Sequence, residues 1–111
     1  MDVVTPRRFE VWLLNQDPTL GSEINKTRPC LVISPDEMNL SHINAVIVAP
    51  MTTTQKPYPT RINLNFNNQE GQVALDQIRT VDKIRFKKQI GRIKPKEQKA
   101  VTRCLSELFS E

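Results

Sequence analysis

The sequence predicts a mainly β protein, in which a small antiparallel sheet or barrel is closed by a C-terminal helix. Three observations support this prediction. Short apolar runs of strand length recur along the chain, turn residues separate them, and one helical apolar pattern follows Pro95. Because 111 residues can build only one hydrophobic core, we expect a single domain that covers residues 1–111.

The expected strands are short and turn residues separate them. They cover residues 8–14, 30–33, 43–49, 61–66, 72–78 and 86–93. Residues 61–66 alternate polar and apolar without a break, which indicates a strand with one solvated face. The connection over residues 15–28 is longer than most, and loops of that length are commonly functional. Residues 80–83 are expected to form one helical turn.

A C-terminal helix is expected to begin at Pro95, because proline suits the first helical position. The apolar residues that follow share one helical face. They are Val101, Cys104, Leu105, Leu108 and Phe109. We expect this face to pack on the sheet or on a second subunit.

The composition favours an anionic partner such as nucleic acid, because 16 basic residues exceed 12 acidic ones and the pI is near 9.3. Cys30 and Cys104 form no CxxC pair, and His42 is the only histidine, which we expect in a solvated turn. We find no signal-peptide pattern and no apolar stretch of transmembrane length. A cytoplasmic protein with reduced thiols, no metal and no cofactor is therefore expected.

Three polar clusters are expected at strand ends or in the loops beside them, where a sheet can present side chains to a ligand. Their members are Glu23, Lys26 and Arg28 in the first, Thr52 and Thr53 in the second, and Asp76, Gln77 and Arg79 in the third. The clusters contain acids, arginines and hydroxyl groups, which are the residue types that RNA cleavage without a metal requires.

Cleavage of RNA at a 2′-hydroxyl needs a base, fixed positive charge around the phosphate, and a donor to the leaving oxygen. Glu23 or Asp76 is a candidate base, arginines such as Arg28 can grip phosphate oxygens, and Thr52 can donate a hydrogen bond. Each residue also has a structural interpretation. Glu23 can be a surface charge, Arg28 a partner of a surface carboxylate, and Asp76 a helix cap.

Four segments resemble, in order, the sequence blocks of the MazF/PemK (Kid-like) toxin family. They are EVWL, DPT and GSE within residues 10–23, KTRPCLVISP at 26–35, VIVAPMT at 46–52, and LDQIRTVDK at 75–83. The similarity extends over about residues 8–109. It implies an SH3-like barrel with a C-terminal helix, a fold shared with CcdB-type toxins, and a homodimer. It also implies an mRNA interferase that is restrained by a cognate acidic antitoxin.

The activity that the resemblance implies is metal-independent, sequence-selective cleavage of single-stranded RNA to a 2′,3′-cyclic phosphate and a 5′-hydroxyl. Arg28 matches the arginine that stabilises the transition-state charge, and Thr52 matches the threonine that contacts phosphate. Glu23 falls at a position where some members carry a functional acid, and Asp76 matches the aspartate proposed as base in one branch. Glu10 matches an acidic position that orients its neighbours. We expect the remaining cluster residues to contact RNA, namely Lys26, Thr53, Gln77 and Arg79.

Two departures from the family pattern bear on these roles. Phe9 stands where glycine is usual between an arginine and the acid, and Ala74 stands where the branch with the aspartate base has an arginine. Both Glu23 and Asp76 therefore remain candidate bases. A pKa of roughly 12.5 to 13.8 makes an arginine a poor proton donor, so charge stabilisation is the favoured role for Arg28.

Two other functions are compatible with the fold. Gyrase poisons share it without cutting RNA, but they act through a C-terminal Trp-Gly-Ile, whereas this chain ends Leu-Phe-Ser-Glu and its only tryptophan is Trp12. A barrel that binds nucleic acid without cutting it would carry aromatic residues spaced along its strands. The chain has only one Trp, one Tyr and four Phe, several of them on apolar strand faces.

Overall fold

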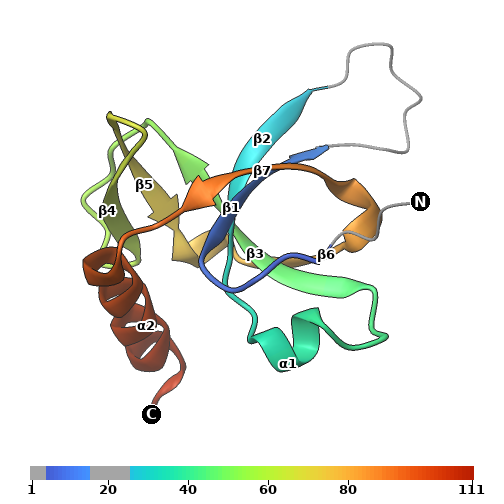
Figure 1. Ribbon diagram of the computed structural model, residues 1–111. Coiled ribbons are helices and arrows are strands. Elements are labelled where there is room, and N and C mark those ends of the chain that lie inside the picture. Colours follow the sequence, from blue (N-terminus) through green and yellow to red (C-terminus); the bar gives the residue numbers. More distant parts are fainter. Residues whose placement is uncertain (1–4, 16–25) are drawn as a thin grey trace.

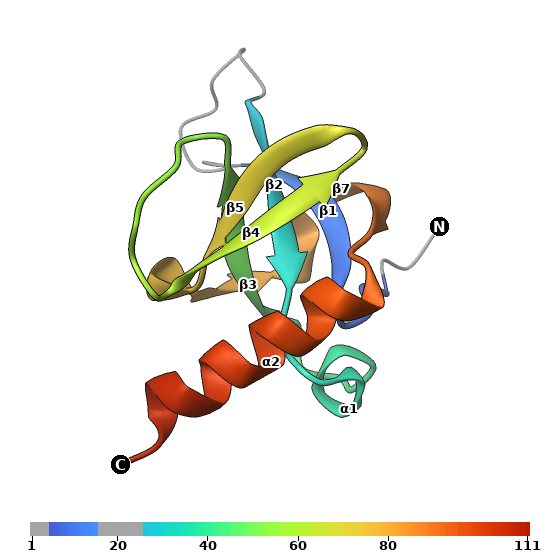
Figure 2. The ribbon, with the colours of Figure 1, turned by 90° about the vertical axis from the view of Figure 1, so that its left-hand side faces the viewer.

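The computed structural model describes residues 5–15 and 26–111. Its elements, with η for a 3₁₀ helix, are β1 (Glu10–Asn15), β2 (Thr27–Val32), α1 (Asp36–Asn39), β3 (Ala45–Thr52), β4 (Arg61–Phe66), β5 (Gln69–Ala74), η2 (Leu75–Gln77), β6 (Arg79–Asp82), η3 (Lys83–Arg85), β7 (Phe86–Arg92) and α2 (Pro95–Phe109). The strands form a curled antiparallel half-barrel, with α2 lying beside the β4–β5 hairpin (Figures 1 and 2). The expected fold class is confirmed.

Strand β3 organises the sheet, whose order is β4-β5-β3-β2-β1-β7 with β6 also paired to β3. One edge of β3 pairs with β2, and its other edge pairs first with β6 and then, at Met51 and Thr52, with β5. Gly71 permits this exchange of partners, because a Cβ there would lie 2.8 Å from the Thr52 carbonyl oxygen. Val32 at the end of β2 and Arg79 at the start of β6 therefore lie level with Val48, on opposite edges of β3.

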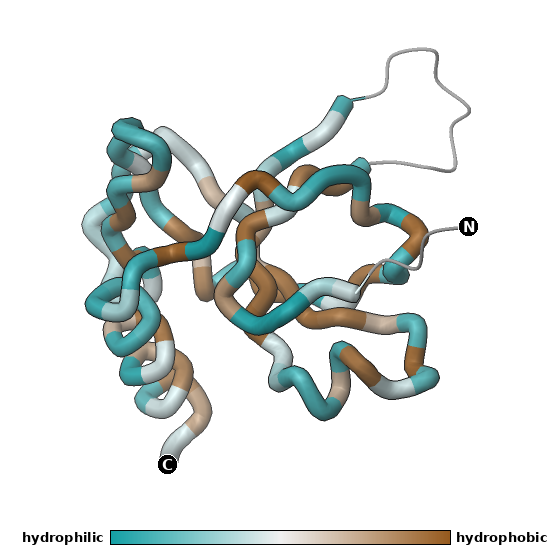
Figure 3. Tube along the Cα trace, viewed as in Figure 1, coloured by the Kyte–Doolittle hydropathy of each residue, from teal (hydrophilic) through white to brown (hydrophobic). Residues whose placement is uncertain are grey.

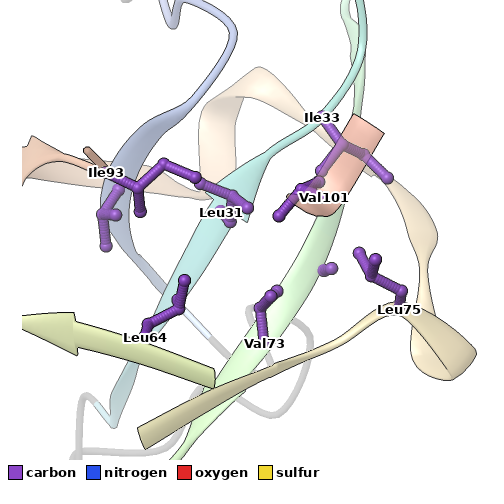
Figure 4. Close-up of a cluster of buried hydrophobic side chains, with 9 residues drawn as sticks. Leu31, Ile33, Leu64, Val73, Leu75, Ile93 and Val101 are labelled. Atoms are coloured by element: carbon purple, nitrogen blue, oxygen red, sulfur yellow. The ribbon is translucent and has the colours of Figure 1, made fainter. Parts of the chain in front are cut away.

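Two apolar clusters fill the two faces of the curled sheet. The first lies between the sheet and α2, as Figure 4 shows, and contains Val11, Leu31, Ile33, Ala49, Leu64, Val73, Leu75, Ile93 and Val101. The second contains Leu14, Cys30, Val32, Val46, Val48, Val81 and Phe86. Successive residues of β2 alternate between the clusters, so both faces of this strand are buried. This explains the unbroken apolar run at residues 30–33.

The apolar face of α2 packs on the sheet over its middle turns only. Val101 is buried, and Cys104 and Leu105 pack against the first cluster. Leu108 and Phe109, in the last turn, are 40% and 70% exposed. Figure 3 shows hydrophilic and hydrophobic residues alternating along this helix, as expected when one face is packed. Packing on the sheet is therefore confirmed for the middle of the helix.

Several expected boundaries were wrong. Strand β5 ends at Ala74 and η2 follows, whereas the sequence predicted a strand through residue 78. Residues 80–83 were expected to form a helical turn, but β6 runs to Asp82, because Val81 is buried in the second cluster and pairs with Val46 of β3. The helical turn comes next, at η3, where the Asp82 side chain accepts a hydrogen bond from the Ile84 backbone N–H.

Phe9 has a backbone φ of 73°, in the left-handed region that favours glycine. For a residue with a side chain this conformation costs roughly 1–2 kcal/mol. Its N–H donates to the Val32 carbonyl at 2.8 Å, its carbonyl accepts from the Ile93 N–H at 3.1 Å, and its ring packs on the first cluster. The positive φ accounts for the glycine of the family pattern at this position, and these contacts hold phenylalanine in the same conformation.

Candidate active site

The ends of three strands surround a polar cavity of about 300 Å³, which we call the arginine pocket. Its lining consists of Leu14, Asn15, Arg28, Cys30, Pro50, Gln77 and Arg79. Sheet pairing places these residues, because Leu14 lies opposite Arg28 and Val48 lies opposite Arg79. The structure thus brings together Arg28, Gln77 and Arg79, which the sequence had placed in two separate clusters.

The arginine pocket is positively charged. Burial raises the pKa of the Cys30 thiol, against the opposing charges of Arg79, Arg28 and Arg85, so three guanidinium groups lie near one sulfur. Arg85 also donates from Nε to the Asn15 carbonyl oxygen at 3.1 Å. No aspartate or glutamate lines the pocket in the part of the chain that the structure describes. Such a site suits a phosphate group, and its thiol stays protonated.

Thr52 and Thr53 lie beside this pocket, at the end of β3. Both line an adjoining hollow of about 230 Å³ whose walls are largely apolar, and Pro29, next to Arg28 in the chain, lines it too. Cys30 of β2 pairs with Pro50 of β3. Because the two strands are antiparallel, Arg28 lies level with Thr52, two residues further along the same pair. The Thr52 hydroxyl accepts from the Thr54 N–H at 3.1 Å, which leaves its hydrogen available to donate.

Asp76 does not line the arginine pocket but forms a salt bridge with Arg61, the first residue of β4. Its Oδ1 accepts from Arg61 Nε at 2.8 Å and from Thr60 Oγ1 at 3.0 Å, and its Oδ2 accepts from Arg61 Nη2 at 3.2 Å. We call this arrangement the Arg61–Asp76 clasp. The Arg61 hydrogen bonds, and then that of Thr60, lower the pKa of Asp76 to about 2, against the opposing effect of its partial burial.

The other candidate residues fall into three situations. Glu10 Oε1 accepts from the Arg7 N–H at 2.8 Å and from Trp12 Nε1 at 2.9 Å, so Glu10 holds the start of β1, at the end remote from Asn15. Lys26 is exposed directly before β2. Glu23 lies outside the described residues.

The sequence reasoning missed Asn15 in the pocket lining, Arg85 beside the pocket, and Arg61 of the clasp. Asn15 was assigned to a turn, although it is the last residue of β1 and pairs with Thr27. Arg85 was one of many basic residues between 83 and 92 and had no distinguishing pattern. Arg61 was expected only as a solvated strand residue, because its partner Asp76 is 15 residues away.

Among residues 5–15 and 26–111, no group of three or more His, Cys, Asp or Glu side chains could hold a metal ion. Within the same ranges, no helix is both long enough and apolar enough to cross a membrane. His42, the only histidine, is exposed after α1, as the sequence predicted.

Comparisons with known proteins agree with this geometry. A family model described as "PemK-like, MazF-like toxin of type II toxin-antitoxin system" matches residues 7–109. The chain is 33% identical over 100 residues to endoribonuclease MazF9 of Mycobacterium tuberculosis, covering 82% of this chain and 85% of the relative. It is 30% identical over 105 residues to endoribonuclease MazF of Staphylococcus saprophyticus, covering 89% and 87%.

Solved structures support the same relationship. A MazE–MazF crystal structure from Deinococcus radiodurans has a TM-score of 0.78 and 27% identity, and 96% of each chain is covered. An endoribonuclease in complex with its cognate antitoxin, from a mycobacterial species, has a TM-score of 0.76 and 24% identity over 92% of each chain, which shows the shared fold. With a family model that matches nearly its whole length, the chain belongs to the PemK-like, MazF-like toxin family of type II toxin-antitoxin systems.

Proposed function

We propose that this chain is an endoribonuclease toxin, an mRNA interferase that cuts single-stranded RNA at selected sequences. The observation that carries the proposal is the arginine pocket, where Arg28 and Arg79 line a cavity that has no carboxylate among its described lining residues. A phosphodiester is the anion that such a pocket would take in an RNA-cutting family. The largely apolar hollow next to Thr52 suits an unstacked base of the same strand.

The proposed reaction uses the substrate's own 2′-hydroxyl as nucleophile, because it is held close to the phosphorus by the ribose. A carboxylate base removes its proton, the 2′-oxygen bonds to phosphorus, and the bond to the 5′-oxygen breaks. Arg28 stabilises the charge that develops on the phosphate oxygens, and Thr52 donates a hydrogen bond to one of them. Water protonates the leaving oxygen, and the products are a 2′,3′-cyclic phosphate and a 5′-hydroxyl.

Of the two candidate bases, we assign the role to Glu23. Both oxygens of Asp76 already accept hydrogen bonds in the Arg61–Asp76 clasp, and its pKa of about 2 makes it a weak proton acceptor at neutral pH. The preference for Glu23 rests on the reduced basicity of Asp76 and on the resemblance to family members that carry a functional acid at position 23. Lys26, Thr53, Gln77 and Arg79 are assigned to RNA binding.

The reaction is proposed to need no metal. The carboxylates of the described residues are dispersed rather than gathered into the oxygen-rich set that Mg²⁺ requires, and Cys30 and Cys104 lie in separate elements. A cytoplasmic site of action follows from an mRNA substrate.

The toxin is proposed to act as a homodimer under the control of an antitoxin. Leu108 and Phe109 extend the packed face of α2 into solvent, which supports an apolar contact with a second copy. One structural neighbour is described as bound to its cognate antitoxin. A short acidic segment that covers the arginine pocket would compete directly with RNA, because both are anionic.

Incubation of the purified protein with a long single-stranded RNA and a strong chelator tests the proposal. Discrete cuts with 5′-hydroxyl ends are expected, and they should vanish when a single deoxyribose lies immediately 5′ of a cut. A gyrase poison or a passive RNA-binding barrel would leave the RNA intact. A requirement for added Mg²⁺, or cleavage at the deoxyribose, would overturn the proposed chemistry.

A further inference from the structure

We propose that Arg61 and Asp76 are positioning residues, which hold the η2 turn so that Gln77 and Arg79 face the RNA phosphate. The inference rests on the proposed function and deepens it, because it assigns a role to Arg61 and removes Asp76 from the reacting groups. Arg61 lies directly opposite Ala74 across the β4–β5 pair. The guanidinium that contacts Asp76 therefore comes from the neighbouring strand β4 and not from position 74.

The clasp is a well-formed contact. Two parallel N–H groups of one guanidinium bind both oxygens of one carboxylate, which is a geometrically specific arrangement. The Arg61 side chain is only 8% exposed, and its guanidinium lies over the Tyr58 ring at 5.3 Å from the ring centre. Arg61 is thus fixed by contacts on two sides, and Asp76 is fixed by Arg61.

The buried side chain of Leu75 holds the η2 turn on its apolar side, and the Arg61–Asp76 clasp holds it on its polar side. Ala74, the residue before the turn, provides no side-chain cap. The Leu75 N–H donates to the Thr60 carbonyl oxygen at 3.0 Å, which ties the turn to the residue before β4. Gln77 is the last residue of η2, and Arg79 begins β6 two residues later. A shift of the turn would therefore move the side chains of Gln77 and Arg79 in the arginine pocket.

A base and a positioning residue predict different kinetics. Loss of a catalytic base lowers kcat by about 10²- to 10⁴-fold. Loss of a positioning contact misplaces the groups that bind substrate, so KM rises while kcat changes little. The two roles also predict different effects of Arg61→Ala. If Asp76 is the base, loss of the guanidinium makes its carboxylate more basic. If Asp76 is a positioning residue, the same change breaks the contact that holds the turn.

The test measures kcat and KM on a short single-stranded RNA that contains one mapped cut site. We expect Arg61→Ala, Asp76→Asn and Asp76→Ala each to raise KM by about two- to tenfold, with no further rise in the double variant Arg61→Ala/Asp76→Ala, because each single change already breaks the contact. Arg61→Lys should recover part of the loss. Arg103→Ala and Glu107→Gln, charge-matched changes on exposed positions of α2, should behave as wild type.

Amide hydrogen exchange provides a readout that does not depend on cleavage. In Arg61→Ala, exchange should accelerate at Leu75 to Ile78 while β1 to β3 keep their protection. Wild-type KM and unchanged exchange in Arg61→Ala would overturn the proposal, and so would a 100-fold loss of kcat in Asp76→Asn without a defect in Arg61→Ala. If wild-type protein cuts no RNA, the proposed function fails, and the exchange experiment still tests the clasp.

Discussion

The arginine pocket and the Arg61–Asp76 clasp use the same side chain in opposite ways. In the clasp, Arg61 binds a carboxylate with two hydrogen bonds and its side chain is largely covered. In the pocket, Arg28 is exposed and pairs with no carboxylate of the described residues. An arginine with a carboxylate partner fixes structure, whereas one without such a partner keeps its donors for an incoming anion.

This contrast also distinguishes the two regions by chemistry. Asp76 neutralises the positive charge at the clasp, so the turn is held without attracting RNA. At the pocket, the charges of Arg28, Arg79 and Arg85 add up around Cys30. The clasp and the pocket are joined by the three residues of η2. The clasp supports the site, and the pocket binds the substrate. Substitutions in the pocket should therefore impair cleavage or RNA binding, whereas substitutions in the clasp should act through the position of the turn.

The largest effect is expected from Arg28→Ala, which should lower the rate of RNA cleavage by about 10²- to 10³-fold, as is typical when one preorganised charge donor is lost. Because Arg28 is exposed at the start of β2, the fold should be retained. Cleavage of a labelled RNA and the thermal unfolding midpoint are the measurements. The matched control is Arg103→Ala on α2. A folded Arg28→Ala protein that cuts at the wild-type rate would place the site elsewhere.

A smaller loss is expected from Thr52→Val, which removes the hydroxyl and keeps the branched shape that suits a strand. A lost hydrogen bond to a charged phosphate should lower kcat by about 10- to 100-fold. Thr102→Val, on the exposed surface of α2, serves as the control. If Thr52→Val cuts as wild type while Arg28→Ala is inactive, the phosphate is held by the arginines alone.

The sequence predicted elements whose pairing partners are close along the chain or whose hydrophobic pattern is regular. Strand β4 was expected over the residues that it occupies, and α2 was expected to begin at Pro95. Strand β6 was missed, because its four residues are apolar only at Val81 and it forms by pairing with β3, more than 30 residues earlier. Local pattern alone does not report such pairing.

In the candidate site, too, some residues were predicted from the sequence and one contact was not. Arg28, Gln77 and Arg79 were predicted as members of polar clusters at strand ends, and the resemblance added a role for Arg28. The β2–β3 and β3–β6 pairings bring them to one cavity. The partner of Asp76 could not be predicted, since it depends on the register of β4 against β5. That register is set by the two-residue turn at Asn67 and Asn68, whose φ values of 51° and 64° suit a tight hairpin.

The charge of Arg79 should contribute mainly to RNA binding. Arg79→Ala is expected to raise KM with little change in kcat, and to reduce by about 1 the slope of log affinity against log salt, because one phosphate contact is lost. Binding of an uncleavable deoxy-substituted strand at several salt concentrations measures this slope. An unchanged slope would show that Arg79 makes no phosphate contact and acts only within the protein.

The smallest effect concerns acid stability and tests the clasp alone. The pKa of Asp76 is about 2 in the folded protein against an ordinary value of 3.8, because Arg61 favours the ionised carboxylate. A lowered folded-state pKa contributes stability that is complete above the unfolded value and is lost as the pH falls through the folded value. Denaturant unfolding of wild type and Asp76→Asn should therefore differ at neutral pH and converge between about pH 4 and pH 2.

Several features make this comparison specific to the clasp. The Asp36 carboxyl, whose pKa is also lowered, first by the hydrogen bond from the Arg8 N–H, is present in both proteins and cancels in the difference. Glu107→Gln, on the exposed surface of α2, is the control variant and is unfolded at the same pH values. High salt should shrink the Asp76 difference only in part, because the Arg61 side chain is shielded from solvent. A difference that persists undiminished at pH 2 would mean that Asp76 stabilises the turn without its charge, and the clasp would then be a hydrogen-bonded contact rather than an ion pair.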